Sequence, residues 1–474
     1  MKFRQFGRAL RRSHLFLIFS LALGSLGVTI LGGYWWLNRF QSPLQAQVPI
    51  LAQDESIRVY FNHNQAVEFV EPYRGKTRKG DDLAAKLILG INSAQSQIDV
   101  AVQEFQLPNI AQALVARVAA GVRVRVILEH QYSNPLSELS AADLAQLKPR
   151  ELEHYQEFQR LVDLDRDGTL SPMEISQRDA LIILRNGRVP ILDDRADGSM
   201  GSGLMHHKFM VVDGKTVIVT SANWTMSDIY GDFSRPESEG NQNNLVEIQS
   251  QDLAQVFLGE FNLMWGDGNM GNPTSQFKAR KPPRLPVEVL VGKTKVLVQF
   301  SPTSAQGGWE NSTNGSIGKL LGSSHQQVDL ALFVFSEPTL GSILQAQSQH
   351  GVKVRGLIDR QFAYRDYSSA LTLMGVDPQN LCQGVQPGVQ PLETIGVPTL
   401  PGGDLLHHKF AVIDRQTVIT GSHNWSNAAN YRNDETLLVI ENNPIVAAHF
   451  DREFDRLYQQ AVVGIPAKLR RQRC

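Results

Sequence analysis

The chain contains one structural unit twice, and this internal repeat constrains the fold more than any other feature of its 474 residues. Residues 98–102 recur as 328–332, and residues 121–125 recur as 351–355 at the same offset. Each copy reads as a buried strand, an amphipathic helix, a glycine that stops the helix and a second strand. This alternation predicts two similar α/β domains, each with a mostly parallel sheet flanked by helices, related by a pseudo-twofold axis.

Composition places the boundaries of these domains. Residues 271–287 are rich in proline, glycine and basic side chains, which is typical of a linker. We therefore predict a first domain at 55–270 and a second domain at 288–465.

The N-terminal residues 1–47 predict a basic cytoplasmic tip followed by a transmembrane anchor. Five basic residues precede an uncharged apolar run at 15–37, which is long enough to cross a hydrocarbon core of about 30 Å as a helix. The basic flank favours a cytoplasmic N-terminus and export of the rest to the periplasmic or extracellular side. The alternative is a signal peptide that is cut after Ala46, which would release a secreted protein.

The closest match between the two copies is a set of polar residues with the spacing His-x-Lys-x4-Asp. On a strand, the histidine and the lysine point to the same face, so both can reach one bound group. Lysine ammonium and asparagine amide groups donate to phosphate oxygens, and histidine serves as nucleophile or general acid near neutral pH. Two half-sites across a twofold axis would place two histidines on opposite sides of one phosphate, as in-line displacement requires. The set comprises His206, Lys208, Asp213, Ser221 and Asn223 in the first copy, and His407, Lys409, Asp414, Ser422 and Asn424 in the second.

This duplicated motif resembles the signature of the phospholipase D superfamily, and the resemblance spans residues 57–454. It implies that one histidine forms a covalent phosphohistidine while the other acts as general acid and then as base for water. By this resemblance His206 is the nucleophile and His407 the acid, although symmetry leaves the exchange of roles open. It also implies phosphate binding by Lys208, Lys409, Asn223 and Asn424, support from Ser221 and Ser422, and a loop-fixing role for Asp213 and Asp414.

The family also implies a downstream carboxylate that orients the histidine, as an aspartate does in a serine-protease triad. The second copy supplies Glu435, whereas the first copy has Asn243 at the matching place. We therefore expect His206 to be the less well tuned histidine, unless Glu237 or Glu239 substitutes.

The first copy also carries an insertion at about 148–180, since 77 residues separate Glu129 from His206 whereas 48 separate Asp359 from His407. The insertion holds a twelve-residue segment that resembles the calcium loop of an EF-hand, with glycine at its sixth position and a helical pattern before it. We expect a structural or regulatory Ca²⁺ there, without a catalytic role. Its predicted ligands are Asp163, Asp165, Asp167, Thr169, Ser171 and Glu174.

The predicted substrate is a phospholipid headgroup ester, whose hydrolysis releases phosphatidate. This prediction rests on the resemblance, on the predicted anchor, which places the chain beside membrane lipid, and on a formal net charge of −1, which provides no overall field that would gather nucleic acid. An endonuclease of the same superfamily is the first alternative, although the basic residues are scattered. Phosphatidyl transfer, as in a cardiolipin synthase, would follow if an alcohol replaced water. A calcium-sensing membrane scaffold is the non-enzymatic alternative, and the completeness of both motifs argues against it.

Overall fold

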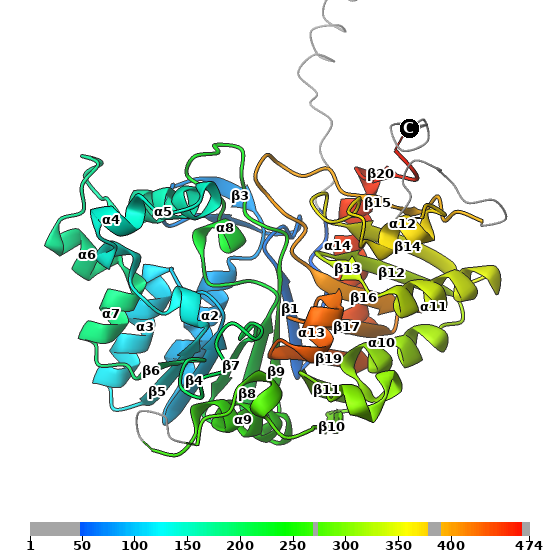
Figure 1. Ribbon diagram of the computed structural model, residues 1–474, viewed down its shortest axis with the longest axis horizontal. Helices are drawn as coiled ribbons and strands as arrows, with labels where there is room; N and C mark the ends of the chain where they lie inside the picture. Colours follow the sequence, from blue (N-terminus) through cyan, green and yellow to red (C-terminus); the bar gives the residue numbers. More distant parts are fainter. Residues whose placement is uncertain (1–47, 269–273, 378–389, 467–474) are drawn as a thin grey trace, which may run out of the picture. The chain divides into compact units, whose positions relative to one another are not determined.

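The computed structural model describes residues 48–268, 274–377 and 390–466 (Figure 1). The residues from Ile50 onward form one compact unit. The predicted anchor at 1–47 lies outside the described residues. Within the described ranges, no helix is both long and apolar enough to span a lipid bilayer.

The first half of this unit is built on a seven-stranded sheet with the order β1-β9-β8-β7-β4-β5-β6. Its only parallel pairs among the described strands are β4 with β5 and β5 with β6. The strands are β1 (Ile57–Phe61), β4 (Gln97–Val102), β5 (Arg123–Leu128), β6 (Ile191–Asp193), β7 (Lys208–Val212), β8 (Thr216–Thr220) and β9 (Asn244–Gln249).

The second half repeats this arrangement in a nine-stranded sheet with the order β10-β11-β19-β17-β16-β12-β14-β15-β20. Here β12, β14 and β15 run parallel, as β4, β5 and β6 do in the first half. The strands are β10 (Val287–Val291), β11 (Thr294–Ser301), β12 (Gln327–Leu332), β14 (Lys353–Ile358), β15 (Ile395–Val397), β16 (Lys409–Ile413), β17 (Thr417–Gly421), β19 (Glu435–Glu441) and β20 (Val462–Val463). Two small ribbons pair β2 (Glu68–Val70) with β3 (Thr77–Lys79) and β13 (Phe335–Ser336) with β18 (Trp425–Ser426).

The prediction of mixed α/β sheets flanked by helices is confirmed, but the prediction of mostly parallel sheets is wrong. In the first sheet β7, β8, β9 and β1 are all joined by antiparallel pairs, and β7 is also antiparallel to β4. The reason is local: a turn of Asp213, Gly214 and Lys215 joins β7 directly to β8, and so short a connection permits only an antiparallel hairpin. The parallel strand–helix–strand unit therefore accounts for only one side of each sheet.

The crossover helices confirm the repeated strand–helix–strand pattern. Helices α3 (Pro108–Ala119) and α11 (Pro338–Gln349) both begin with proline, whose missing N–H is harmless in the first turn. Both are followed by a glycine with positive φ, 86° at Gly121 and 92° at Gly351, which stops the helix at low steric cost.

Helices cover both sheets, and one core is shared by the two halves. Helices α9 (Gln251–Trp265) and α14 (Pro444–Gln459) contribute to the shared core, where Phe61 of β1 packs edge-on against Phe450 at 5.1 Å between ring centroids. The outer core of the first half includes α2 (Leu83–Ser93), α3 and α7 (Ala180–Asn186), and that of the second includes α10 (Thr313–Gly322), α11 and α12 (Ser369–Leu373). The remaining helices are α4 (Ala141–Leu144), α5 (Pro149–Val162), α6 (Pro172–Arg178), α8 (Met226–Ile229) and α13 (Asn427–Tyr431).

The aspartate of each motif lies in the hairpin turn at the far end of the strand from the histidine. Asp213 has φ of 53° and Asp414 has φ of 51°. The Asp414 carboxylate accepts three backbone N–H groups, from residues 325, 326 and 327, at 2.9, 2.7 and 2.9 Å, and Asp213 accepts the matching three at 95, 96 and 97. Burial raises the pKa of both carboxyls, but the backbone donors outweigh it and hold each pKa below its usual value. Each aspartate therefore connects its hairpin turn to the start of the neighbouring strand, β4 in the first half and β12 in the second.

Replacing Asp414 with alanine is expected to lower the free energy of unfolding by about 1–3 kcal/mol at pH 7, because charge-assisted hydrogen bonds to the backbone are lost. The pKa of this carboxyl is lower in the folded state, so its stabilisation is present above the unfolded pKa and disappears as pH falls through the folded value. Urea unfolding of wild type and Asp414→Ala at pH 7 and at about pH 3 measures this. A difference that stays constant between the two pH values contradicts the assignment.

Candidate active site

The two histidine–lysine motifs start the two central strands of the unit. Lys208 is the first residue of β7 and Lys409 the first residue of β16, and each histidine lies two residues earlier. His206 and His407 are each 6% exposed, and both lysines are fully buried. The two imidazoles are thus almost enclosed, and the two ammonium groups are fully enclosed.

The segments that lead into the motifs pair across the two halves. The N–H of His206 donates to the carbonyl of Asp434 at 2.9 Å, and the N–H of Asp434 donates to the carbonyl of Leu204 at 2.8 Å. In the matching exchange, the N–H of Gln242 donates to the carbonyl of Leu405 at 2.8 Å. Each histidine is therefore placed beside the downstream strand of the opposite half.

His206 is oriented by Glu435, which comes from the second half. Its Nδ1 lies 2.6 Å from Oε2 of Glu435, and the same oxygen accepts the Ser422 hydroxyl at 2.7 Å. A carboxylate accepts, so Nδ1 carries the proton and the lone pair of the neutral ring is on Nε2. This is the tautomer that a nucleophilic imidazole needs.

His407 has an amide where His206 has a carboxylate. Its Nδ1 lies 3.1 Å from Oδ1 of Asn243, which also accepts the Ser221 hydroxyl at 2.7 Å. The Asn243 amide nitrogen donates to the carbonyls of Asp228 and Asn241, which fixes the direction of the side chain. Ser221 and Ser422 thus have equivalent positions, each supporting the group that orients the opposite histidine.

The expectation that His206 would be the less well tuned histidine is wrong. Glu435 lies downstream of His407 in the chain but orients His206. The reason is that the segment before His206 forms backbone hydrogen bonds with Asp434 of the other half. Glu239 lies 3.8 Å from His63 and its N–H donates to Asp404, while Glu237 packs beside Gly402, so Glu435 orients His206 in place of either glutamate.

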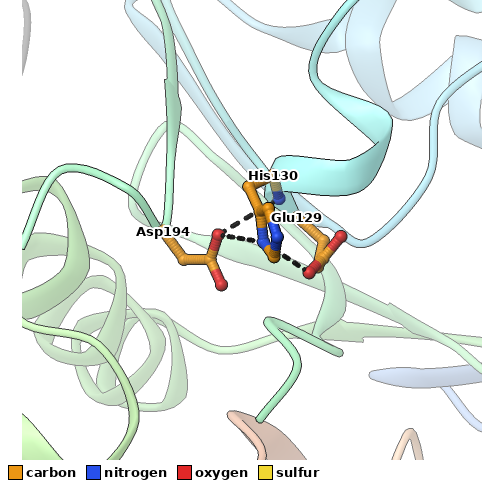
Figure 2. A group of neighbouring side chains, drawn as sticks. All are labelled: Glu129, His130 and Asp194. Atoms are coloured by element: carbon orange, nitrogen blue, oxygen red, sulfur yellow. Dashed lines mark hydrogen bonds and ion pairs between the residues drawn. The ribbon is translucent and has the colours of Figure 1, made fainter. Parts of the chain in front are cut away.

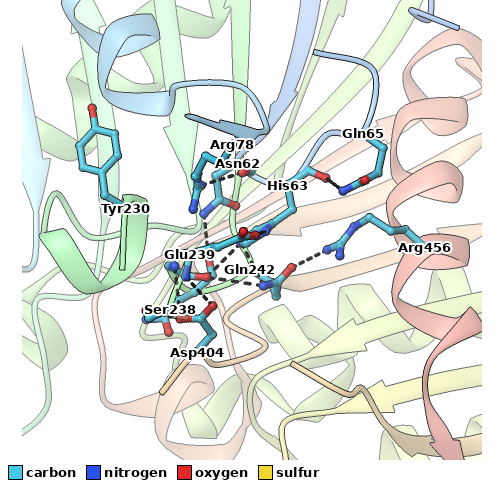
Figure 3. Close-up of polar contacts among 12 residues, drawn as sticks. Asn62, His63, Gln65, Arg78, Tyr230, Ser238, Glu239, Gln242, Asp404 and Arg456 are labelled. Carbon is cyan, nitrogen blue, oxygen red and sulfur yellow. Dashed lines mark hydrogen bonds and ion pairs between the residues drawn. The ribbon is translucent and has the colours of Figure 1, made fainter. Parts of the chain in front are cut away.

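A polar network holds residues 238–242 against the second half (Figure 3). Ser238 donates its hydroxyl to Asp404 at 2.5 Å, and the Gln242 amide accepts from Arg456 and lies 3.0 Å from His63. Asn62 reaches the stretch from the other side, accepting the N–H of Asn243 at 2.9 Å. The position of Asn243, and with it the orientation of His407, depends on this network.

The two lysines have different surroundings. The Lys208 ammonium donates to Gln103 at 3.1 Å and to the carbonyl of His206 at 3.0 Å. The Lys409 ammonium donates to the carbonyl of His407 at 2.6 Å and lies 5.0 Å from the centre of the Phe333 ring. Burial lowers the pKa of Lys208 to about 8, and burial, followed by the charge of Lys208, lowers the pKa of Lys409 well below its usual value.

The four groups belong to one electrostatic site. Burial lowers the pKa of His206 well below its usual value, and the charges of Lys208 and Lys409 add to the effect. Burial likewise lowers the pKa of His407, followed by Lys409, Lys208 and then His206. Positive groups from each half therefore disfavour protonation in the other half. A bound anion would relieve this repulsion.

Asn223 and Asn424 have equivalent positions in the two halves. Each has a buried side-chain oxygen that has no hydrogen-bond partner among the described residues. Unsatisfied buried polar groups are uncommon and recur at functional sites. A carbonyl oxygen does not bind a phosphate oxygen, since both are acceptors, so phosphate binding through the N–H₂ groups of these amides stays a prediction.

A second charged cluster lies at the carboxyl ends of β5 and β6 (Figure 2). The Nδ1 atom of His130 lies 2.8 Å from Glu129 and 2.9 Å from Asp194. Asp194 also accepts from the buried ammonium of Lys278, in the segment that was predicted to be a linker. Part of that segment is buried, and there Lys281 forms ion pairs with Glu260 at 2.5 Å and with Asp434 at 2.8 Å.

The predicted calcium loop connects α5 to α6. Carboxylate oxygens of Asp163, Asp165 and Glu174 lie within 4.8 Å of one another, a spacing that suits a shared ion with oxygens at about 2.3–2.6 Å. Gly168 has φ of 86°, which the sharp turn at the sixth position requires. Thr169 and Ser171 have other contacts: Thr169 donates to Asp167, and Ser171 exchanges hydrogen bonds with Glu174 at the start of α6. Three of the predicted ligands therefore lie close enough to share one ion, and the fourth acidic residue, Asp167, is outside that group.

Three participants in the site were missed by the sequence interpretation: Gln103, Phe333 and Asp228. Gln103 and Phe333 follow β4 and β12 directly and contact the two lysines. The constant offset of the repeat pairs them, so the sequence contained this signal. Asp228, whose Oδ1 lies 3.7 Å from Nδ1 of His407, has no such signal because it contacts its partner across the two halves.

Residues 87–265 and 317–458 match the family model described as "Cardiolipin synthase, PLD-like domain". With two matched segments that together cover most of the chain, the protein belongs to this family of phospholipase D-like proteins.

Relatives support the same family over shorter stretches. The mitochondrial cardiolipin hydrolase of Homo sapiens is 35% identical over 135 residues, which are 28% of this chain and 46% of that protein. A phospholipase D of Rickettsia typhi is 26% identical over 139 residues, which are 29% of this chain and 60% of that protein. The chain thus spans about half the length of the curated relatives it matches. The crystal structure of phosphatidylserine synthase from Haemophilus influenzae Rd KW20 shares the fold, with a TM-score of 0.55 at 14% identity over 87% of this chain and 88% of that one.

Proposed function

We propose that the chain is a phospholipase D-type phosphodiesterase that hydrolyses a phospholipid headgroup ester through a phosphohistidine intermediate. The observation that carries the proposal is the 2.6 Å contact between His206 and Glu435, which sets the tautomer of a nucleophile in a site that also holds two buried lysines. Family membership and the names of the curated relatives support this class of reaction.

In the first step, Nε2 of His206 attacks phosphorus and the bond from phosphorus to the headgroup oxygen breaks. His407, protonated at Nε2, gives its proton to that leaving oxygen, so the headgroup leaves as an alcohol and not as an alkoxide. Lys208 and Lys409 offset the negative charge that develops on the phosphoryl oxygens.

In the second step, His407 removes a proton from water, and the resulting hydroxide attacks phosphorus. The bond between phosphorus and His206 breaks, which releases phosphatidate and restores both imidazoles. If an alcohol enters in place of water, the same step transfers the phosphatidyl group.

The full chain, incubated with labelled phosphatidylcholine, cardiolipin and single-stranded DNA with and without Ca²⁺, tests the proposal. We expect phosphatidate from a phospholipid, and no cleavage of DNA. DNA cleavage without lipid hydrolysis would support the endonuclease instead, and a phosphatidyl–alcohol product formed with added glycerol would support the transferase. Failure to turn over any of these substrates contradicts the proposed activity and favours the scaffold.

We also propose that the loop of Asp163, Asp165, Asp167 and Glu174 holds a Ca²⁺ ion with a structural or regulatory role. Helix α5 ends at Val162, directly before the loop, and its residues Arg150, His154, Tyr155 and Phe158 line a cavity of about 570 Å³ that also contacts Glu104. Glu104 directly follows Gln103, the partner of Lys208. An ion that fixes the end of α5 would therefore stabilise a wall of this cavity, close to the catalytic lysine.

Calcium is expected to raise the melting temperature of the wild-type chain by several degrees, and Glu174→Gln is expected to remove most of that increase. Backbone and side-chain donors from Ser171, with backbone N–H groups of the loop, lower the pKa of Glu174 to about 2, so the carboxylate is charged at any working pH. Differential scanning calorimetry in Ca²⁺ and in EGTA measures the shift. Glu151→Gln, in the first turn of α5, is the control. Equal melting temperatures in the two buffers contradict a bound ion.

For the membrane, we propose that residues 1–47 anchor the chain with its catalytic part on the exported side. The family relatives whose names refer to lipid reactions support a membrane substrate. Protease accessibility in sealed vesicles tests the orientation, because the proposed arrangement leaves the catalytic part outside the cytoplasmic compartment.

A further inference from the structure

The two histidines of the site are not equally supplied with negative charge. His206 has the carboxylate of Glu435 on its Nδ1, whereas His407 has the neutral amide of Asn243. Burial lowers the pKa of His407 most, and the charges of Lys409, Lys208, His206 and His408 lower it further. A histidine that must hold and return a proton therefore lacks the stabilising anion that its counterpart has.

One carboxylate of the first half lies close enough to fill this role. Oδ1 of Asp228 lies 3.7 Å from Nδ1 of His407, on the same side of the ring as Asn243. Asp228 is 4% exposed, and His407 is its only ion-pair partner among the described residues. Burial raises the pKa of its carboxyl, while the Asn241 amide, the N–H of Asn223 and the charge of Lys409 lower it. An opposite charge within about 4–6 Å favours the protonated imidazole.

Asp228 is held in place by a dedicated set of donors. Its Oδ2 accepts the N–H of Asn223 at 2.6 Å, and its Oδ1 accepts the Asn241 amide at 2.5 Å. Its own N–H donates to the hydroxyl of Thr225, which caps the short helix α8. The carboxylate is therefore fixed both to a predicted phosphate-binding residue and to the stretch that carries Asn243.

The second half has no carboxylate at the position that corresponds to Asp228. The stretch after the motif aligns Thr225 with Ser426, which places Asp228 opposite Ala429. Glu435, which orients His206, accepts from Asn433 at 3.1 Å, and Asn433 corresponds to Asn241 in the first half. The equivalent asparagine thus contacts a carboxylate in both halves, from Glu435 in one and from Asp228 in the other.

We propose that Asp228 is the positioning carboxylate of His407, replacing the charge that Asn243 does not supply. This inference rests on the proposed function, in which His407 acts as acid and base. Asn243 sets the direction of the ring, and Asp228 stabilises the imidazolium from slightly farther away. The carboxylate touches no reacting atom, so its effect is on the proton affinity of His407.

The test compares Asp228→Asn, Asp228→Asn with Asn243→Glu, and Asp232→Asn as the matched control. Asp232 is a carboxylate on the same segment that accepts the Ser227 hydroxyl at 2.6 Å. For hydrolysis of a phosphodiester with a poor leaving group, we expect Asp228→Asn to lower kcat by about 10–100-fold, with KM little changed. Because loss of the anion lowers the pKa of His407, the alkaline limb of the pH profile moves to lower pH. Adding Asn243→Glu to this variant is expected to restore kcat and the pH profile, since it gives His407 the carboxylate that His206 has in Glu435.

A second readout does not depend on turnover. The ring protons of His407, identified by their loss in His407→Asn, are titrated by NMR in the full-length chain, and Asp228→Asn is expected to lower this pKa by about one pH unit or more. An unchanged pKa overturns the inference, even if the enzyme is active. If the wild type hydrolyses no phosphodiester, the proposed function fails and the titration alone decides the role of Asp228. A fall in kcat that leaves the pH profile and the titration unchanged, or that Asp232→Asn reproduces, also overturns it.

Discussion

Replacing His206 with asparagine is expected to abolish hydrolysis, with a fall in kcat of at least about 10⁴-fold. The reaction needs a covalent bond from Nε2 of this ring to phosphorus, and asparagine has no comparable nucleophile. Asparagine can still accept or donate near Glu435, which is fully buried, so the variant avoids leaving that group without a partner. Steady-state assays on the lipid substrate and on a phosphodiester with a nitrophenol leaving group measure the loss, and calorimetry checks the fold.

The comparison with His407→Asn separates the two roles. A nitrophenolate needs no proton to leave, so His407→Asn is expected to form the phosphohistidine from that substrate and then hydrolyse it slowly. The intermediate should accumulate and be visible by mass spectrometry of the intact chain. Accumulation in His206→Asn with none in His407→Asn would reverse the assignment of nucleophile and acid.

Replacing Glu435 with glutamine is expected to reduce kcat by about 10²–10³-fold with a small change in KM. The amide keeps the shape of the side chain but removes the charge that makes His206 more basic. The glutamate oxygens also accept hydrogen bonds from Ser422 and Asn433. The glutamine amide replaces one of these acceptor oxygens with an N–H₂ group, which cannot accept. The buried position allows no water to compensate.

Glu441→Gln is the matched control for this variant, because Glu441 lies at the other end of the same strand and forms a surface ion pair with Lys295 at 2.9 Å. We expect wild-type kinetics from it. Equal losses in the two variants would show that a carboxylate-to-amide change on β19 acts through stability, and would contradict an orienting role for Glu435.

The sequence predicted the repeat and the residues of the two His-x-Lys-x4-Asp motifs, but Gln103 and Asp228 were missed. The constant offset between the copies predicted the strand–helix–strand units around α3 and α11, and the shared His-x-Lys-x4-Asp spacing paired the two histidines. Strand direction was harder to predict, because the strand–helix–strand pattern covers only three strands of each sheet. The tight turn at Asp213 makes the remaining pairs antiparallel, and its importance was not recognised from the sequence.

The partner of each histidine could not be predicted from the motif alone. Glu435 follows His407 in the chain, and a reading along the sequence assigns it to that histidine. Backbone pairing between Asp434 and the segment before His206 reverses the assignment, and such long-range pairing leaves no local pattern. The same applies to Asp228, which lies 179 positions from its histidine along the chain and 3.7 Å from it in space.

Each histidine is oriented by a residue of the opposite half, so one half cannot complete a histidine site by itself. Self-association would have unequal results for the two pieces: a symmetric pair of second halves would give each imidazole a glutamate, whereas a pair of first halves would give each an asparagine. The two histidines therefore have different roles because two unlike halves pair with each other, and their covalent connection in one chain makes this pairing permanent. A circular permutant opened between the halves should keep that asymmetry, since the pairing, and not the order of the chain, defines it.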